Sequence, residues 1–318
     1  MLTLLDSLGP LIRTSTLQSN KPVLMTMSPT RRTFLKQTSL LAAASALPAR
    51  WVRAEDLPPD RKLKLRYAVA SDLHYGHPGT SYHERAQDLV GWMNREKAGK
   101  GLDACLINGD GTHDKPSLLT ELRDQHLSQL EMPYYCAKGN HDYLDAQPRS
   151  PTGSWEKIWG YPADHSFMLK DFAFVMADTS ATANFRAWLA ADRNWLQAEF
   201  AKYRDAAGIF VLIHIAQREE GVKGWPRCGV LEAEAAKGEA VMDLIESTPK
   251  VKAIFHGHNH DETGMWLSGG KRYFFTSRTG AIWGAAHGYR IVEVDEQHRM
   301  VTYQIDAREG KELNRNAI

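Results

Sequence analysis

The chain has 318 residues, with 39 Lys and Arg against 38 Asp and Glu, and a formal net charge of +1. This length accommodates one large domain with a sizeable core after a short leader, and it is too short for two ordinary domains with linkers. The balanced charge provides no basic stripe of the kind that follows a phosphate backbone, so no nucleic-acid partner is expected. The three cysteines imply no disulfide framework, because Cys105 and Cys136 fall in predicted buried strands.

The amino-terminal segment has the pattern of a bacterial export signal. Residues 30–36 read Thr-Arg-Arg-Thr-Phe-Leu-Lys, and a mildly apolar stretch at 38–47 precedes small residues that suit cleavage after Ala46 or after Ala54. That stretch is shorter than the roughly 20 residues that span a bilayer, so no stable membrane anchor is expected. We predict that residues 1–54 are a twin-arginine signal peptide with an upstream leader. Export by the twin-arginine translocase would make the protein periplasmic or secreted.

Five short, mainly apolar runs predict buried strands, at 65–70, 104–107, 134–137, 209–213 and 251–255. A polar motif follows each run, and the motifs contain, in chain order, Asp72 and His74, Asp110, Asn140 with His141 and Asp142, His214, and His258 with His260. In open α/β folds, ligands at the carboxyl ends of successive strands converge on one edge of a sheet. We therefore expect the five motifs to build one pocket.

Helices are predicted between these strands, because apolar residues recur at helical spacing. The predicted segments lie at 86–93, from Pro116 and Ser117 to 130, at 196–203 after Asp192 as N-cap, and at 241–245 before Pro249. Strand chemistry returns at 167–178, 265–267, 271–276, 289–294 and 300–305, which predicts a second sheet facing the first. The order of these elements indicates an α/β fold.

The donor atoms in the five motifs are carboxylate oxygen, amide oxygen and imidazole nitrogen. These donors suit Zn, Mn or Fe, and the absence of cysteine from the set argues against a structural zinc cage. The predicted chemistry is therefore that of a reactive metal centre.

In this order the motifs resemble the DxH, GDxxD, GNH(D/E), H and GHxH pattern of the calcineurin-like metallophosphoesterase superfamily, from Asp72 to His260. The resemblance implies a four-layer αββα sandwich, with two facing mixed sheets flanked by helices, over residues 55–318. It also implies two metal ions. One would be held by Asp72, His74 and His260 and the other by Asn140, His214 and His258, with Asp110 bridging both.

The same resemblance implies a phosphoric ester hydrolase. Two cations would lower the pKa of a water between them, and the resulting metal-bridging hydroxide would attack phosphorus. His141 resembles the family's non-ligand histidine, which stabilises the transition state or protonates the leaving oxygen. Asp142 is one residue that could orient it.

The chain departs from the family pattern at two positions. The second Asp of GDxxD, which orients the catalytic His in many members, is His113 here. Either Asp114 or Asp142 would then orient His141, or His113 would contact the metals as Tyr does at the matching position of purple acid phosphatases. Ile215 and Ala216 follow His214 where Pro is usual two residues on, which we interpret as a loop variation that leaves the ligand in place.

The sequence gives weaker evidence about the substrate than about the metal site. Arg218 and Trp225 lie in the loop after His214, where a Trp could stack a base or sugar, although a solvated loop fits the same residues. Arg149 and Arg278 are weaker candidates. The spacing of the motifs resembles small single-domain phosphodiesterases, so we expect a small-molecule phosphodiester before a monoester. The alternatives are a catalytically silent metal-binding or interaction module, and a nuclease or phospholipid-active phosphoesterase.

Overall fold

The computed structural model describes residue 57 and residues 61–143, 154–180, 188–219, 229–261, 263–280 and 287–317. The predicted signal peptide, Arg149 and Trp225 lie outside these residues. Within them, no helix combines the length and the apolar character needed to cross a membrane.

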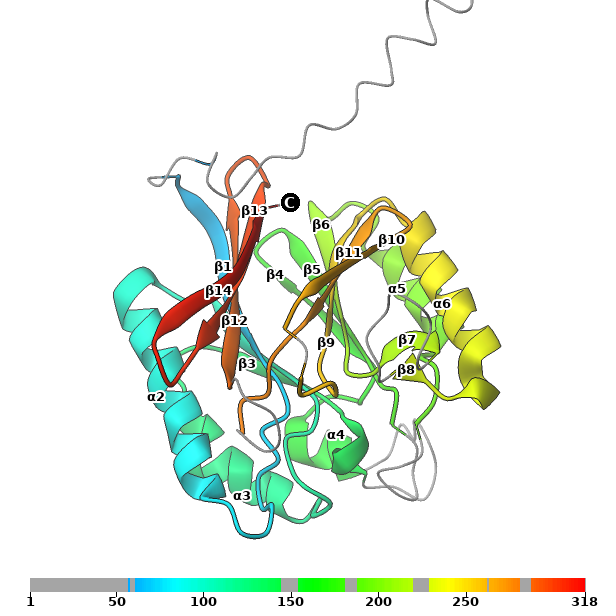
Figure 1. Cartoon of the computed structure of the whole chain (residues 1–318). Coiled ribbons are helices and arrows are strands. Elements are labelled where there is room, and N and C mark those ends of the chain that lie inside the picture. The colour runs from blue at the N-terminus through cyan, green and yellow to red at the C-terminus, as the bar shows by residue number, and fades with distance from the viewer. Residues whose placement is uncertain are drawn as a thin grey trace, which may run out of the picture. The chain divides into compact units, whose positions relative to one another are not determined.

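Two six-stranded mixed sheets lie face to face (Figure 1). The first has the order β14 (Lys311–Ala317), β13 (Met300–Asp306), β12 (Gly288–Asp295), β1 (Leu63–Ala70), β2 (Ala104–Asn108) and β3 (Tyr134–Ala137). The second has the order β10 (Met265–Ser268), β11 (Lys271–Phe275), β9 (Val251–His256), β6 (Gly208–Ile213), β5 (Phe172–Ala177) and β4 (His165–Leu169). Strands β1 to β3 are parallel, as are β5, β6, β9 and β11, and the other neighbours are antiparallel.

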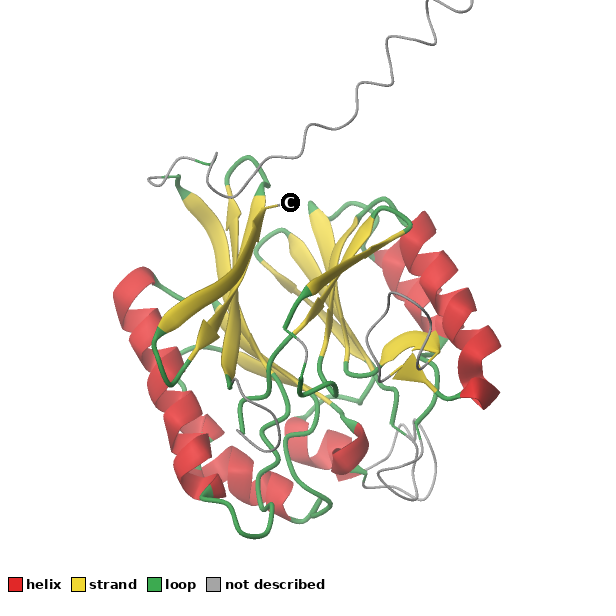
Figure 2. Cartoon of the chain, viewed as in Figure 1, coloured by secondary structure: helices red, strands yellow, loops and turns green. Residues whose placement is uncertain are grey.

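Helices cover the outer faces of both sheets (Figure 2). Helices α2 (Tyr82–Lys100) and α3 (Leu118–Gln125) pack on the first sheet, and α5 (Arg193–Lys202) and α6 (Ala235–Ser247) pack on the second. The shorter elements in the described part of the chain are α4 (Ser154–Trp159), three 3₁₀ turns (Leu127–Gln129, Asn140–Asp142, Glu232–Glu234) and a small parallel sheet of β7 (Ala216–Glu219) and β8 (Gly229–Val230). The predicted fold class, an α/β fold with two mixed sheets flanked by helices, is confirmed.

Strands with two buried faces explain the mainly apolar runs in the sequence. In β1, Leu65, Tyr67 and Val69 pack between the sheets, whereas Ala68 and Ala70 pack toward the helices. Tyr67 meets Phe174 and Phe210 of the second sheet with ring centroids 5.0 and 5.3 Å apart. A strand that is buried on both faces loses most of the polar alternation of a half-exposed strand, and from Tyr67 to Ala70 β1 is apolar at every position.

The placement of the late strands corrects the sequence prediction. Strands β10 and β11 join the second sheet as expected, but β12 pairs antiparallel with β1, which places β12 to β14 in the first sheet. The strands that precede the metal motifs are also divided, because β1, β2 and β3 lie in one sheet and β6 and β9 in the other. The prediction that the motifs converge at the edge of a single sheet is therefore wrong. They converge where the strand ends of the two sheets adjoin.

The predicted helix boundaries were partly correct. Asp192 Oδ1 accepts hydrogen bonds from the backbone N of Asn194 and Trp195 at 3.0 and 3.1 Å, which confirms it as the N-cap of α5. The helix expected to run from Pro116 to residue 130 ends at Gln125. His126 interrupts it with φ −122°, and its buried ring contacts the Tyr75 hydroxyl at 3.3 Å.

Acid sensitivity is expected from a histidine buried in β4. Burial lowers the pKa of His165 to about 4 from an ordinary value of 6.5, although the Ala163 carbonyl 3.3 Å away raises it. Below pH 6.5 the unfolded chain therefore binds a proton that the folded chain does not bind until about pH 4, so acidification favours unfolding. Between about pH 7 and about pH 4.5, the free energy of unfolding of His165→Phe should therefore fall by about 2 to 3 kcal/mol less than that of the wild type.

Urea unfolding of both proteins at the two pH values checks this expectation. The other titrating groups are common to both proteins and cancel in the comparison. An equal loss of stability in the wild type and in His165→Phe would contradict it.

Candidate metal centre

The loops after the strands concentrate left-handed backbone at residues other than glycine. Asp72, His74, Asp110 and His258 have φ of 56°, 47°, 51° and 64°. Such conformations cost on the order of 1–3 kcal/mol each and persist where surrounding contacts enforce them. Here the loops bind each other, because Asp72 N donates to Gly109 O at 3.0 Å and His74 N donates to Asp110 O at 2.9 Å. This clustering of strain marks the loops as the functional part of the fold.

Two glycines allow these loops to approach closely. A Cβ on Gly139 would lie 2.1 Å from Asp110 N, and one on Gly109 would lie 2.4 Å from His214 Nδ1. Side chains at either position would push the loops apart. The glycines of the GD and GN motifs are therefore needed for packing.

Asp72, His74 and His260 form a first group of potential ligands, with donor atoms that all lie within 4.8 Å of one another. His260 Nε2 is 3.1 Å from Asp72 Oδ1 and 3.1 Å from His74 Nε2. Asp72 and His74 are fully buried, and His260 is 10 % exposed. Three donors from the two sheets thus converge on one point.

Asp110, His214 and His258 form a second such group. Asp110 Oδ2 is 3.1 Å from His214 Nε2 and 3.6 Å from His74 Nε2, so this carboxylate faces both groups. His214 Nδ1 bonds to the Asn108 carbonyl at 2.6 Å, which directs Nε2 at Asp110. The predicted ligand Asn140 is buried at the start of the neighbouring 3₁₀ turn.

The buried charges of this cluster are compensated within it. Burial would raise the pKa of Asp72, but the imidazoles of His260 and His214 lower it to about 2. Burial would lower the pKa of His214, but Asp110 and Asp72 raise it to about 10. Two buried carboxylates whose counter-charges are imidazoles form a site that favours cations.

The family model of the calcineurin-like phosphoesterases matches residues 65–262, which include both ligand groups. The chain is a calcineurin-like phosphoesterase. Its family supports metal-dependent hydrolysis of phosphoesters and two metal ions, and the buried carboxylates and imidazoles fit such ions. No curated protein sequence matches the chain significantly.

Solved structures with the same fold include two phosphatases and a membrane-complex anchor. A dimetal phosphatase from Danio rerio is 15% identical with a TM-score of 0.56, covering 81% of this chain and 99% of its own. Purple acid phosphatase PPD1 from yellow lupin (Lupinus luteus) is 13% identical with a TM-score of 0.52, covering 80% and 53%. GAP50, the anchor in the inner membrane complex of Plasmodium, is 13% identical with a TM-score of 0.53, covering 81% and 89%. At these identities the likeness shows the fold of the phosphoesterase alone.

Asp114 contacts the ring of the predicted acid in this phosphoesterase. His141 Nδ1 lies 2.8 Å from Asp114 Oδ1, and the backbone N of His141 donates to Asp110 Oδ1 at 2.8 Å. Asp114 reaches this position through a left-handed backbone, with φ 53°. Of the two carboxylates considered for orienting His141, the structure places Asp114 against its ring.

Asp142 has different contacts from those expected of an orienting group. Its oxygens accept hydrogen bonds from the backbone N of Gly111, Thr112 and Gly139 and from the Thr112 hydroxyl, at 2.7 to 3.1 Å. Burial and the charge of Asp110 raise the pKa of Asp142 to about 6, although the backbone hydrogen bonds lower it. Asp142 thus joins the loops that follow β2 and β3.

The predicted substrate residues occupy varied places. The Arg218 guanidinium lies 3.3 Å from Glu239 on α6 and 3.3 Å from Ser268 on β10. Arg278 is 2 % exposed and donates to the His260 carbonyl at 2.9 Å, so it supports the loop of a predicted ligand.

Two residues beside the site were missed at the level of sequence. Trp188 lies against His258 with ring centroids 5.0 Å apart, and its indole N donates to Gly229 O. Lys138, directly before the GNHD motif, is buried 3.9 Å from the carboxylate of Asp178. No local pattern marks Trp188, because its contact joins segments that are distant in the chain.

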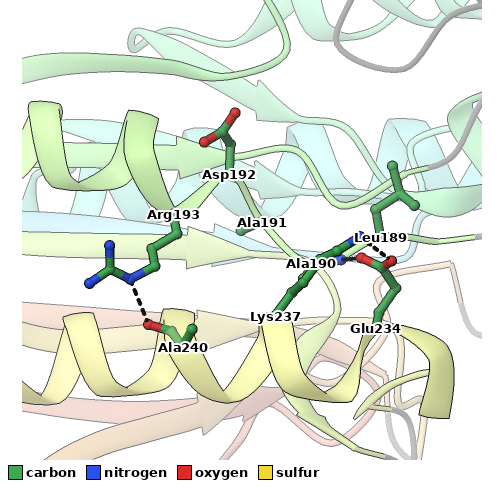
Figure 3. Close-up of a pocket in the computed structure, with 8 residues that line it drawn as sticks. All are labelled: Leu189, Ala190, Ala191, Asp192, Arg193, Glu234, Lys237 and Ala240. Atoms are coloured by element: carbon green, nitrogen blue, oxygen red, sulfur yellow. Dashed lines mark hydrogen bonds and ion pairs between the residues drawn. The ribbon is translucent and has the colours of Figure 1, made fainter.

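A pocket of about 300 Å³ lies between the starts of α5 and α6, and none of the predicted metal ligands lines it (Figure 3). Glu234 accepts hydrogen bonds from the Ala190 backbone N and from Lys237, and Arg193 donates to Ala240 O. Its charged groups thus connect the start of α5 to α6, and we assign this pocket no role in the chemistry.

Proposed function

We propose that this phosphoesterase hydrolyses phosphoric esters of small molecules, and diesters in preference to monoesters. The observation that carries the proposal is the position of Asp110, whose Oδ2 faces His214 Nε2 and His74 Nε2 at 3.1 and 3.6 Å. A carboxylate shared by two donor groups is suited to holding two cations close together. In this proposal Asp72, His74 and His260 hold one metal ion and Asn140, His214 and His258 hold the other, with Asp110 common to both.

We propose Zn, Mn or Fe as the ions, because the donors are imidazole, carboxylate and amide groups. When bound, such ions would lower the pKa of a water held between them and neutralise the phosphoryl oxygens. The chain itself supplies position, since buried and mutually bonded loops hold the donors in place.

His141 is proposed to act on the leaving group. Asp114 binds its Nδ1, so the proton of a neutral ring is held there and Nε2 is the nitrogen that can exchange a proton with substrate. Asp110 fixes the backbone of the same residue by accepting from its N–H at 2.8 Å. In this proposal the Asp110 carboxylate both binds the metal ions and positions the backbone of His141.

We also propose that the twin-arginine signal leads to a periplasmic or secreted enzyme. The seven-residue pattern at 30–36 and the following apolar stretch support this, and the net charge of +1 supports a small-molecule substrate over nucleic acid. Expression of the full chain, with detection of the shortened protein in a periplasmic fraction and its loss in an Arg31→Lys, Arg32→Lys variant, would test the export.

Hydrolysis of bis-para-nitrophenyl phosphate and of para-nitrophenyl phosphate, with metal content measured on the same sample, tests the function. Turnover that favours the diester, with about two metal ions per chain, is the expected result. A preference for the monoester would contradict the diester assignment. No turnover of either compound by fully metallated protein would contradict the hydrolase and favour a silent metal-binding module.

A further inference from the structure

His113 stands at the position where the family pattern has a carboxylate, and it lies between a predicted metal ligand and the predicted acid. Its Nδ1 is 3.0 Å from His74 Nδ1. Its ring is stacked on that of His141, with centroids 4.8 Å apart and planes 16° from parallel. One side chain therefore contacts two functional histidines in different ways.

The nitrogens of His74 have separate surroundings. Nε2 faces the ligand groups, at 3.1 Å from His260 Nε2 and 3.6 Å from Asp110 Oδ2, whereas Nδ1 faces His113. A neutral imidazole that offers Nε2 to a metal carries its proton on Nδ1 and donates it to an acceptor. In this geometry the lone pair of His113 Nδ1 is such an acceptor.

In the group of Asp110, His214 and His258, a backbone carbonyl accepts the hydrogen bond from the imidazole Nδ1. His214 Nδ1 bonds to the Asn108 carbonyl at 2.6 Å, which leaves Nε2 toward Asp110. His74 has 0 % side-chain exposure, so bulk water has no access to replace His113 at its Nδ1. The side chain of His113 thus accepts a hydrogen bond from Nδ1 of His74, as the Asn108 carbonyl does from Nδ1 of His214.

We infer that His113 is a positioning residue of the metal centre, which fixes the tautomer and ring orientation of His74 through its Nδ1 and braces His141 through its stacked ring. This inference rests on the proposed function for its metal-binding role. The side chain of His113 thus has two roles. Its Nδ1, as hydrogen-bond acceptor, affects the metal affinity of His74, and its ring affects the position of His141. His113 Nε2 also lies 3.8 Å from Asp114 Oδ2, and the same carboxylate contacts His141 Nδ1.

Two substitutions separate these tasks. His113→Phe keeps a ring over His141 but removes the acceptor, and His113→Asn keeps an acceptor but removes the ring. The control is His77→Phe, because His77 adjoins His113 with ring centroids 4.2 Å apart and bonds to the Pro78 carbonyl. Each metal-free protein is titrated with Zn²⁺ against a chromophoric chelator, and the ions bound per chain are counted without substrate.

His113→Phe should bind one of the two ions about 10- to 100-fold more weakly, the usual effect of losing such an outer partner, and His77→Phe should match the wild type. His113→Asn should keep both ions within about threefold and show its defect in kcat with little change in KM. Wild-type affinity for both ions in His113→Phe would overturn the inference, as would an equal loss of affinity in the Phe and Asn variants.

Thermal unfolding of the metal-free proteins shows whether each variant folds, and His113→Leu replaces the Phe variant if Phe is not accommodated. Metal counting needs no turnover, so a protein that hydrolyses neither test ester can still show the affinity difference. Failure of the proposed function and failure of this inference are therefore distinguishable.

Discussion

Asp110→Asn should abolish nearly all turnover and lower the metal content of the purified protein. Asp110 Oδ2 faces donors of both ligand groups, so loss of its charge weakens both at once. The amide can still accept from the His141 backbone N through Oδ1, so the loop is expected to remain folded. We expect a fall in kcat/KM of more than about 10³-fold, with fewer than two ions per chain by elemental analysis.

The matched control for this change is Asp171→Asn. Asp171 lies between β4 and β5, is 40 % exposed, and contacts Lys64, away from both ligand groups. It should keep full activity and metal content. Retention of two ions and substantial turnover by Asp110→Asn would show that Asp110 is not the shared ligand.

His141→Ala should leave metal content close to normal while lowering the rate. The ring of His141 contacts Asp114 at 2.8 Å and lies beside His74 with ring centroids 4.8 Å apart, but it belongs neither to the group of Asp72, His74 and His260 nor to that of Asp110, His214 and His258. Its removal therefore leaves the donors of these two groups in place. General acid–base catalysis contributes about 10²- to 10⁴-fold, so kcat should fall within that range. The fall should be smaller for an ester with a good leaving group, such as para-nitrophenol, than for an alkyl ester, because the better leaving group needs less protonation.

Asp114→Asn is the companion to this variant. The amide retains the size of Asp114 but not its charge, so the ring of His141 keeps a neighbour and loses its charged partner. We expect a smaller fall in kcat than for His141→Ala, and little further fall when both changes are combined. Loss of metal from His141→Ala would contradict the division between ligand and acid.

The motifs and their strands were predictable because both signals are local. Apart from Arg66, the run at residues 65–70 is apolar, since both faces of β1 are buried, and the polar residues that follow it come where the strand ends. The order of the motifs then indicated the family, which the match over residues 65–262 shows. The N-cap at Asp192 was also readable, because capping depends on residues two and three positions along the chain.

The sheet to which each late strand belongs was not predictable in this way. The sequence of β12 is typical of a strand whether it pairs with β1 or with a strand of the second sheet. Only the strand with which it pairs determines the sheet to which it belongs. The helix α3 likewise ends at Gln125, next to His126, whose ring contacts Tyr75 far away in the sequence. Such pairings are selected by the packing of the whole core.

The sequence by itself determined which donor types are present, their order, and their positions after buried strands. Only the tertiary structure decided that Asp110 faces both ligand groups, that Asp114 contacts the His141 ring, and that Asp142 joins two loops. The physical reason is that residue type and strand pattern are properties of short segments. The direction of a side chain at a strand end depends on backbone angles, such as φ 53° at Asp114, that are enforced by contacts between loops from different strands.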